Sequence, residues 1–140
     1  MTPFRSQIRL QKFHLDEIQR QVADLDRLAA RLNADLAALD AEAAAEQAVA
    51  QASADAGYAY GAYAASWVER RRKLIDSISD VEGELTEARE KLRDAFTELK
   101  KYELAAASAI ERAVKRRGAR DQIEQDEVGL AVFRRRNAAG

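Results

Sequence analysis

The chain contains no cysteine and one proline, and aromatic residues make up 6% of its 140 residues. Without cysteine it forms no disulfide and no thiolate metal site, which fits a reducing compartment. So few large side chains cannot fill a broad core, but they can fill a narrow seam between helices. No apolar run approaches the roughly 20 residues of a membrane-spanning helix, and the first ten residues are too charged for a signal peptide. We expect a cytoplasmic protein with no inserted segment.

Charge of one sign does not dominate either, since the formal net charge is -1. No bulk attraction to nucleic acid or to anionic lipid follows from such a balance. His14 is the one histidine, and the chain shows no phosphate-binding loop, nucleophile elbow or metal-ligand spacing. We therefore expect no enzyme, no catalytic residue, no cofactor and no metal.

What the chain does contain is typical of long helices. Charged residues make up 34%, and alanine, leucine, glutamate, arginine, lysine and glutamine, all good helix formers, together make up most of the chain. Apolar residues recur every seven residues in two series, which is the a and d pattern of a coiled coil. In the first half the two series are Ile8, Leu15, Val22, Ala29, Leu36, Ala43, Ala50 and Gln11, Ile18, Leu25, Leu32, Leu39, Glu46, Ser53, and the pattern fades into alanine after Leu39. In the second half they are Leu74, Val81, Ala88, Ala95, Tyr102, Ala109 and Ile78, Leu85, Leu92, Leu99, Ala106, Ala113.

Between the two halves, Gly57 and Gly61 are the first glycines and mark the best break. The sequence predicts an all-α fold, with two long helices in an antiparallel coiled-coil hairpin whose second helix is longer. We expect a single hairpin over 1–140, with a helix at about 3–56, a turn at about 57–61 and a helix at about 62–136. One uninterrupted helix with a weak point is the alternative.

Folding about residue 59 places residue i opposite about 118 minus i, so that Ile8 meets Ile110 and Leu36 faces Val81 and Leu85. Residues beyond about Val114 then have no partner in the same chain. This overhang carries a basic run, an acidic stretch and an apolar run that ends at Phe133. Exposed apolar clusters tend to mark interfaces, although a frayed, solvated tail has the same sequence features.

Two groups of residues are candidates for binding a partner protein. Basic residues gather toward the two chain ends, whereas the stretch 24–55 is acidic on balance, and this favours one end entering an acidic socket. An ordinary solvated surface is the alternative. Four aromatic residues precede a run of basic ones near the turn, and Tyr, Trp and Arg are common interface anchors. These four are Tyr58, Tyr60, Tyr63 and Trp67. They alternatively pack across the turn and close it.

The sequence also resembles the flagellar FliJ family over nearly its whole length. The resemblance is carried by Phe4-Arg5 with Ile8-Arg9-Leu10, by the tyrosine- and alanine-rich turn with Trp67, by residues 89–96 and 98–103, and by Asp126-Glu127-Val128-Gly129. The alanine-rich first helix departs from the family pattern.

This resemblance implies a coiled-coil component of the flagellar type III export apparatus, peripheral at the flagellar base on the inner membrane. It implies contact with the export ATPase ring and the export gate protein, and escort of export substrates or their chaperones. The ATPase-side candidates are Arg5, Arg9, Arg116, Arg117 and Phe133, and the gate-side candidates are Tyr58, Tyr60, Tyr63 and Trp67. We expect a monomeric hairpin. A structural coiled-coil scaffold, or a holdase chaperone unrelated to flagella, is the alternative function.

Overall fold

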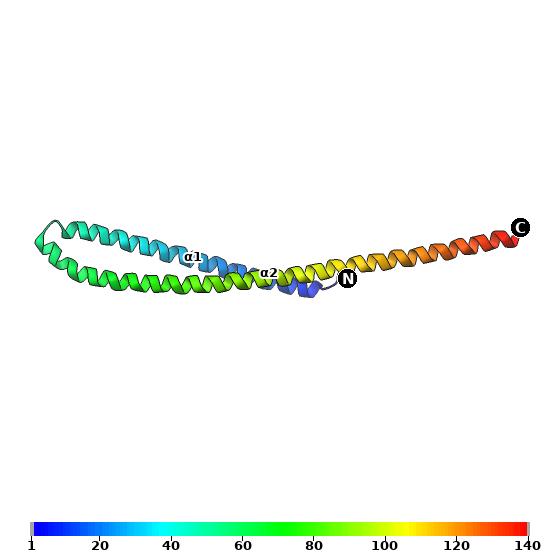
Figure 1. Cartoon of the computed structure of the whole chain (residues 1–140), viewed down its shortest axis with the longest axis horizontal. Helices are drawn as coiled ribbons and strands as arrows, with labels where there is room; N and C mark the ends of the chain where they lie inside the picture. Colours follow the sequence, from blue (N-terminus) through cyan, green and yellow to red (C-terminus); the bar gives the residue numbers. More distant parts are fainter. Residues whose placement is uncertain (1, 140) are drawn as a thin grey trace. The chain divides into compact units, whose positions relative to one another are not determined.

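A computed structural model describes residues 2–139 and shows two helices (Figure 1). α1 is Arg5–Ala50, with 46 residues, and α2 is Ala54–Ala139, with 86 residues. Residues 2–139 contain no strand. The two helices pack against each other in opposite directions, so the predicted all-α hairpin with a longer second helix is confirmed.

Contacts divide the chain into two units. The central unit is His14–Ala95 and contains the turn. The terminal unit takes the rest of the described chain, residues 2–13 and 96–139.

In the central unit, the seam follows the predicted seven-residue series. Every seam residue of α1 from Leu15 to Ala43, and of α2 from Leu74 to Ala95, is partly or fully buried. The most deeply buried are Ile18, Leu39, Val81, Leu85, Ala88 and Ala95. Burial of a Leu, Ile or Val side chain stabilises a protein by about 1.5–3 kcal/mol, while Ala88, only 2% exposed, lets the helices approach closely. The apolar seam therefore holds this unit together.

The turn between the helices consists of Gln51, Ala52 and Ser53, and not of residues 57–61 as predicted. Ala52 N–H donates to the carbonyl of Val49 at 3.0 Å and closes the end of α1. Ser53 then caps α2, because its Oγ accepts a hydrogen bond from Ala56 N–H at 3.1 Å. A side-chain cap thus fixes the reversal without any glycine.

The two glycines that suggested the turn lie inside α2. Gly57 has a packing role, since a Cβ atom there would lie 3.3 Å from the carbonyl oxygen of Ala50, at the end of α1. Gly61 has open space around its Cα atom. Glycine is therefore used for close approach at one position and is merely tolerated at the other.

An earlier turn shifts the register of the hairpin. Folding about residue 59 would place Leu39 opposite residue 79, but the indole N–H of Trp67 donates to the Leu39 carbonyl at 3.2 Å. In the terminal unit, the Phe4 and Tyr102 rings pack with centroids 6.1 Å apart, whereas the predicted register placed Phe4 opposite residue 114. The predicted pairings of Ile8 with Ile110 and of Leu36 with Val81 and Leu85 are therefore wrong.

Both ends of the pair also differ from the predicted bounds. α1 begins at Arg5 because Phe4 has a left-handed backbone, with φ 59°, which costs a non-glycine residue about 1–2 kcal/mol. Ile8 N–H donates to the Phe4 carbonyl at 2.8 Å and starts the helix. α2 continues to Ala139, and every residue from Ile110 to Ala139 is exposed. The overhang is thus longer than predicted, as an earlier turn requires.

Candidate protein-interaction surfaces

Three of the four aromatic candidates near the turn are part of the hairpin itself. Tyr60, Tyr63 and Trp67 are partly buried, and the Tyr60 and Tyr63 ring centroids are 6.0 Å apart. Tyr60 and Trp67 precede Leu74 by fourteen and seven residues, so they extend one of the seam series toward the turn. This spacing is visible in the sequence and would have predicted that the aromatic residues pack across the turn.

Two arginines of α2 cover these rings and reach α1. The Arg71 guanidinium lies 5.7 Å from the Trp67 ring centroid, and its Nε donates to Asp40 Oδ1 at 3.0 Å. Arg70 lies 5.8 Å from the Tyr63 ring centroid, and its Nη2 is 3.4 Å from Glu42 Oε1. Cation–π contacts and ion pairs between the helices therefore stabilise the packing of α1 against α2 near the turn.

The Tyr63 hydroxyl is the one buried side-chain polar atom without a hydrogen-bond partner in the described chain. Burial raises the pKa of this phenol, and the neighbouring Glu42 carboxylate raises it further. Tyr63 therefore stays protonated and neutral and offers no charge to a partner.

Tyr58 is different because its side chain is 92% exposed. It lies in the first turns of α2, and no ring contact, ion pair or hydrogen bond involves its side chain within residues 2–139. Of the four gate-side candidates, Tyr58 is the residue whose whole side chain is open to a partner.

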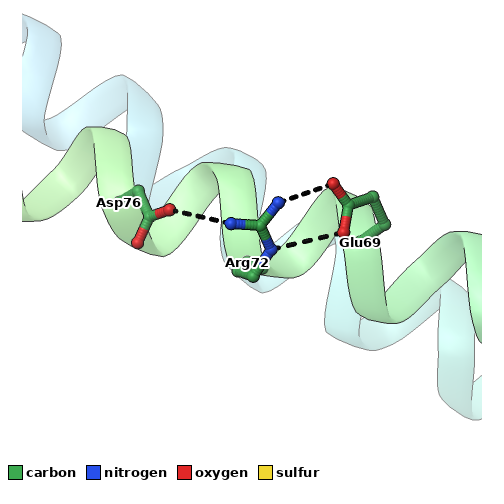
Figure 2. Close-up of polar contacts among 3 residues, drawn as sticks. All are labelled: Glu69, Arg72 and Asp76. Carbon is green, nitrogen blue, oxygen red and sulfur yellow. Dashed lines mark hydrogen bonds and ion pairs between the residues drawn. The ribbon is translucent and has the colours of Figure 1, made fainter.

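The basic run that follows the aromatic residues is also internally paired. Figure 2 shows Arg72 between two carboxylates of its own helix, with Nη2 2.7 Å from Glu69 Oε1 and Nη1 3.5 Å from Asp76 Oδ2. The hydrogen bond from Arg72 lowers the pKa of Glu69 below its ordinary value. Arg70, Arg71 and Arg72 all have carboxylate partners, so the three arginines of this run do not form a free cationic patch.

The cations at the start of α1 have no such partners. Arg5, Arg9 and Lys12 form no ion pair with any residue of the described chain, and the first acidic residue in the sequence is Asp16. Their charges are therefore uncompensated within the terminal unit's first three helical turns.

The exposed part of α2 carries the other ATPase-side candidates. Arg116 and Arg117 have no ion pair with another described residue, and Phe133 is 61% exposed. At about 1.5 Å per residue, Arg116 lies about 20 Å further along α2 than Tyr102, the residue that Phe4 contacts. The terminal unit therefore holds all five candidates without bringing them into one cluster.

Formal charge separates between the two units. The terminal unit has thirteen basic and seven acidic residues, a charge of +6, and the central unit has ten basic and seventeen acidic residues, a charge of -7. These values add up to the -1 of the whole chain. A balance near zero for the chain thus conceals a strongly basic unit, which suits an acidic partner.

No group of three or more His, Cys, Asp or Glu side chains able to hold a metal ion occurs within residues 2–139. Within the same range, neither helix has a stretch long and apolar enough to cross a bilayer.

Comparison with known proteins places the chain in a family. It is 33% identical to the flagellar FliJ proteins of two strains of Caulobacter vibrioides, over 137 residues that cover 96% of this chain and 94% of each relative. No family model matches the chain, and no solved structure does. Because these relatives match nearly the whole chain, the chain belongs to the flagellar FliJ family.

Proposed function

We propose that this chain is a non-catalytic component of the flagellar protein export apparatus that couples the export ATPase ring to the export gate. Membership of the FliJ family supports a role in the flagellar export apparatus. The coupling role is supported by the separation of charge, because a unit of +6 and a unit of -7 offer contrasting surfaces to two partners.

In this proposal the terminal unit binds the ATPase. Arg5, Arg9, Arg116 and Arg117 supply cations without internal partners, and Phe133 supplies an exposed aromatic anchor. An acidic socket in the ATPase ring would attract these groups and speed the encounter at low salt. The protein would then work at the cytoplasmic face of the inner membrane, at the flagellar base.

The gate-side half of the proposal centres on Tyr58. Tyr60, Tyr63 and Trp67 support the local fold, and Tyr58 alone projects fully from it. Exposed tyrosines are frequent binding anchors because they bury a large area at little entropic cost. Export substrates or their chaperones are further partners in this proposal, escorted by the same exposed surfaces.

Charge reversal tests the ATPase half. Arg5→Glu/Arg9→Glu and Arg116→Glu/Arg117→Glu are compared with Arg20→Glu/Arg31→Glu, which changes net charge equally at two exposed arginines of the central unit. We expect the two terminal pairs to weaken binding of the purified export ATPase at least tenfold and the control pair to weaken it less than threefold. Equal loss of affinity in all three variants would show that net charge alone controls ATPase binding. No loss of affinity in any variant would refute the ATPase assignment.

Tyr58→Ala tests the gate half without disturbing the seam. We expect weaker binding to the soluble part of the gate protein and an unchanged helical circular dichroism spectrum. Unchanged gate binding would refute the role of Tyr58.

Light scattering separates this function from a scaffold. A monomeric hairpin gives the mass of one chain, about 15.6 kDa, and a scaffold of paired helices gives twice that mass. Suppression of aggregation of an unrelated unfolded protein, without any binding to the ATPase, would instead support a holdase.

A further inference from the structure

An apolar pair lies on the side of α1 that faces away from the seam. Leu10 is 63% exposed and Phe13 is 57% exposed, whereas Ile8, Gln11 and Leu15 are partly buried in the seam. Leu10 and Phe13 are three residues apart, which makes them neighbours on one helix face. Packing between α1 and α2 does not use this pair, so it has no role in the hairpin.

Leu10 and Phe13 also line a shallow, open groove on the surface of α1, together with Ser6 and Arg9. Ser6 lies one turn before Leu10 on the same face. A groove lined by apolar side chains accepts a protruding apolar side chain, and this is the way a helix or loop of another protein docks onto a helix surface.

The charges around the groove restrict its occupant. Arg9 and Lys12 flank the pair, and Arg5 lies one turn before Arg9, all without ion-pair partners in the described chain. Carboxylates on a partner would pair with these cations around the apolar contact. The arrangement is an apolar centre with a charged rim, which is how protein interfaces are commonly built.

We propose that Leu10 and Phe13, framed by Arg9 and Lys12, dock an apolar side chain on an acidic surface of the export ATPase. The inference rests on the proposed function for the identity of the partner. It adds that the contact has an apolar centre, and that the cations of α1 orient it.

Two other occupants fit the charges less well. A second copy bound through the same face in a symmetric dimer would bring Arg9 and Lys12 against themselves, and like charges oppose that contact. A lipid surface would favour an apolar face that continues along the helix, but Asp16 and Glu17 lie three and four residues after Phe13, next to it on the helix surface. A protein surface with acidic residues suits both features.

Photo-cross-linking with the full chain and the purified ATPase tests the contact. p-Benzoylphenylalanine replaces Phe13, Arg117 or Leu104 in three separate variants. Leu104 is the matched control, since it is 69% exposed in the same unit while neighbouring Lys100 and Lys101 are ion-paired to Glu103 and Glu98. We expect position 13 to form an adduct on an acidic segment of the ATPase that contains an apolar residue, and position 104 to form none.

Binding measurements give the size of the contribution. Leu10→Ser/Phe13→Ser should weaken ATPase binding about tenfold or more, as loss of interface anchors does, and Leu104→Ser should change it less than twofold. Circular dichroism checks that each variant keeps its helix content, which outward-facing substitutions should preserve.

The remaining outcomes overturn the inference in distinguishable ways. An adduct from position 117 without one from position 13 would refute the apolar contact and leave the ATPase assignment standing. Adducts from neither position would end both. An adduct between two copies of this chain, or co-sedimentation with phosphatidylglycerol–phosphatidylcholine vesicles that requires Leu10 and Phe13, would replace the ATPase by that occupant.

Discussion

Replacement of Trp67 by alanine should destabilise the hairpin strongly, because Trp67 belongs to the seam. The ring is partly buried between α1 and the Arg71 guanidinium, and its N–H donates to the Leu39 carbonyl at 3.2 Å. Removing a fully buried aromatic side chain costs about 3–5 kcal/mol, so a partly buried one should cost about 2–3 kcal/mol. The lost hydrogen bond adds about 1 kcal/mol, and the Leu39 carbonyl keeps its helical bond within α1.

Two comparison variants sharpen this prediction. Trp67→Phe removes the indole N–H and little area, so it should cost about 1 kcal/mol. Tyr58→Ala removes a ring that is 92% exposed and should change the free energy of unfolding by less than about 0.5 kcal/mol. Urea unfolding followed by circular dichroism measures all three. If Trp67→Ala cost no more than Tyr58→Ala, the register that places Trp67 against Leu39 would be refuted.

Three further predictions concern glycine, pH and the overhang. Gly61→Ala should stabilise the protein by about 0.5–1 kcal/mol in thermal unfolding, whereas Gly57→Ala should gain less, since its Cβ would meet a backbone oxygen at 3.3 Å; equal gains would contradict that close approach. Arg72 lowers the pKa of Glu69. Their ion pair therefore stabilises the helix above the ordinary glutamate pKa and is lost as the pH falls through the lowered pKa of Glu69. If acid left the NMR signals of Arg72 unchanged both in the wild-type protein and in Glu69→Gln, this ion pair would be contradicted. Deleting residues 110–139 should leave the hairpin's urea midpoint nearly unchanged, because all of them are exposed, and should weaken ATPase binding at least tenfold, because Arg116, Arg117 and Phe133 are lost; a large fall in the midpoint would show that the segment packs.

The seam was predictable because a coiled coil repeats one simple interaction. The series from Leu15 to Leu39 and from Leu74 to Ala95 depend on spacing alone, and spacing survives an error in the turn. The turn was not predictable from glycine, because the reversal at residues 51–53 is closed by the Ser53 cap, and both Gly57 and Gly61 lie inside α2. The close approach of Gly57 to the Ala50 carbonyl depends on how near the two helices lie, which the sequence pattern does not give.

Some of the candidate site residues were also easier to predict from the sequence than others. Exposure of the overhang followed from one helix being longer than the other, so Arg116, Arg117 and Phe133 were correctly expected to be unpartnered in the chain. Within the aromatic cluster, the seven-residue spacing from Leu74 marks Tyr60 and Trp67 as seam residues, but it does not distinguish Tyr63 from Tyr58. Partial burial of Tyr63 and exposure of Tyr58 in the structure make that distinction.

Cross-linking within one chain tests the hairpin and its register most directly. The protein has no cysteine, so Asp40→Cys/Arg71→Cys introduces one thiol pair where the native side chains meet at 3.0 Å. Asp40→Cys/Ile78→Cys is the matched control at the register that a turn near residue 59 requires. With a short bifunctional maleimide, we predict rapid cross-linking within a single chain for the first pair and slow reaction for the second. Faster reaction of the second pair, or covalent dimers from the first, would contradict the intramolecular hairpin described above.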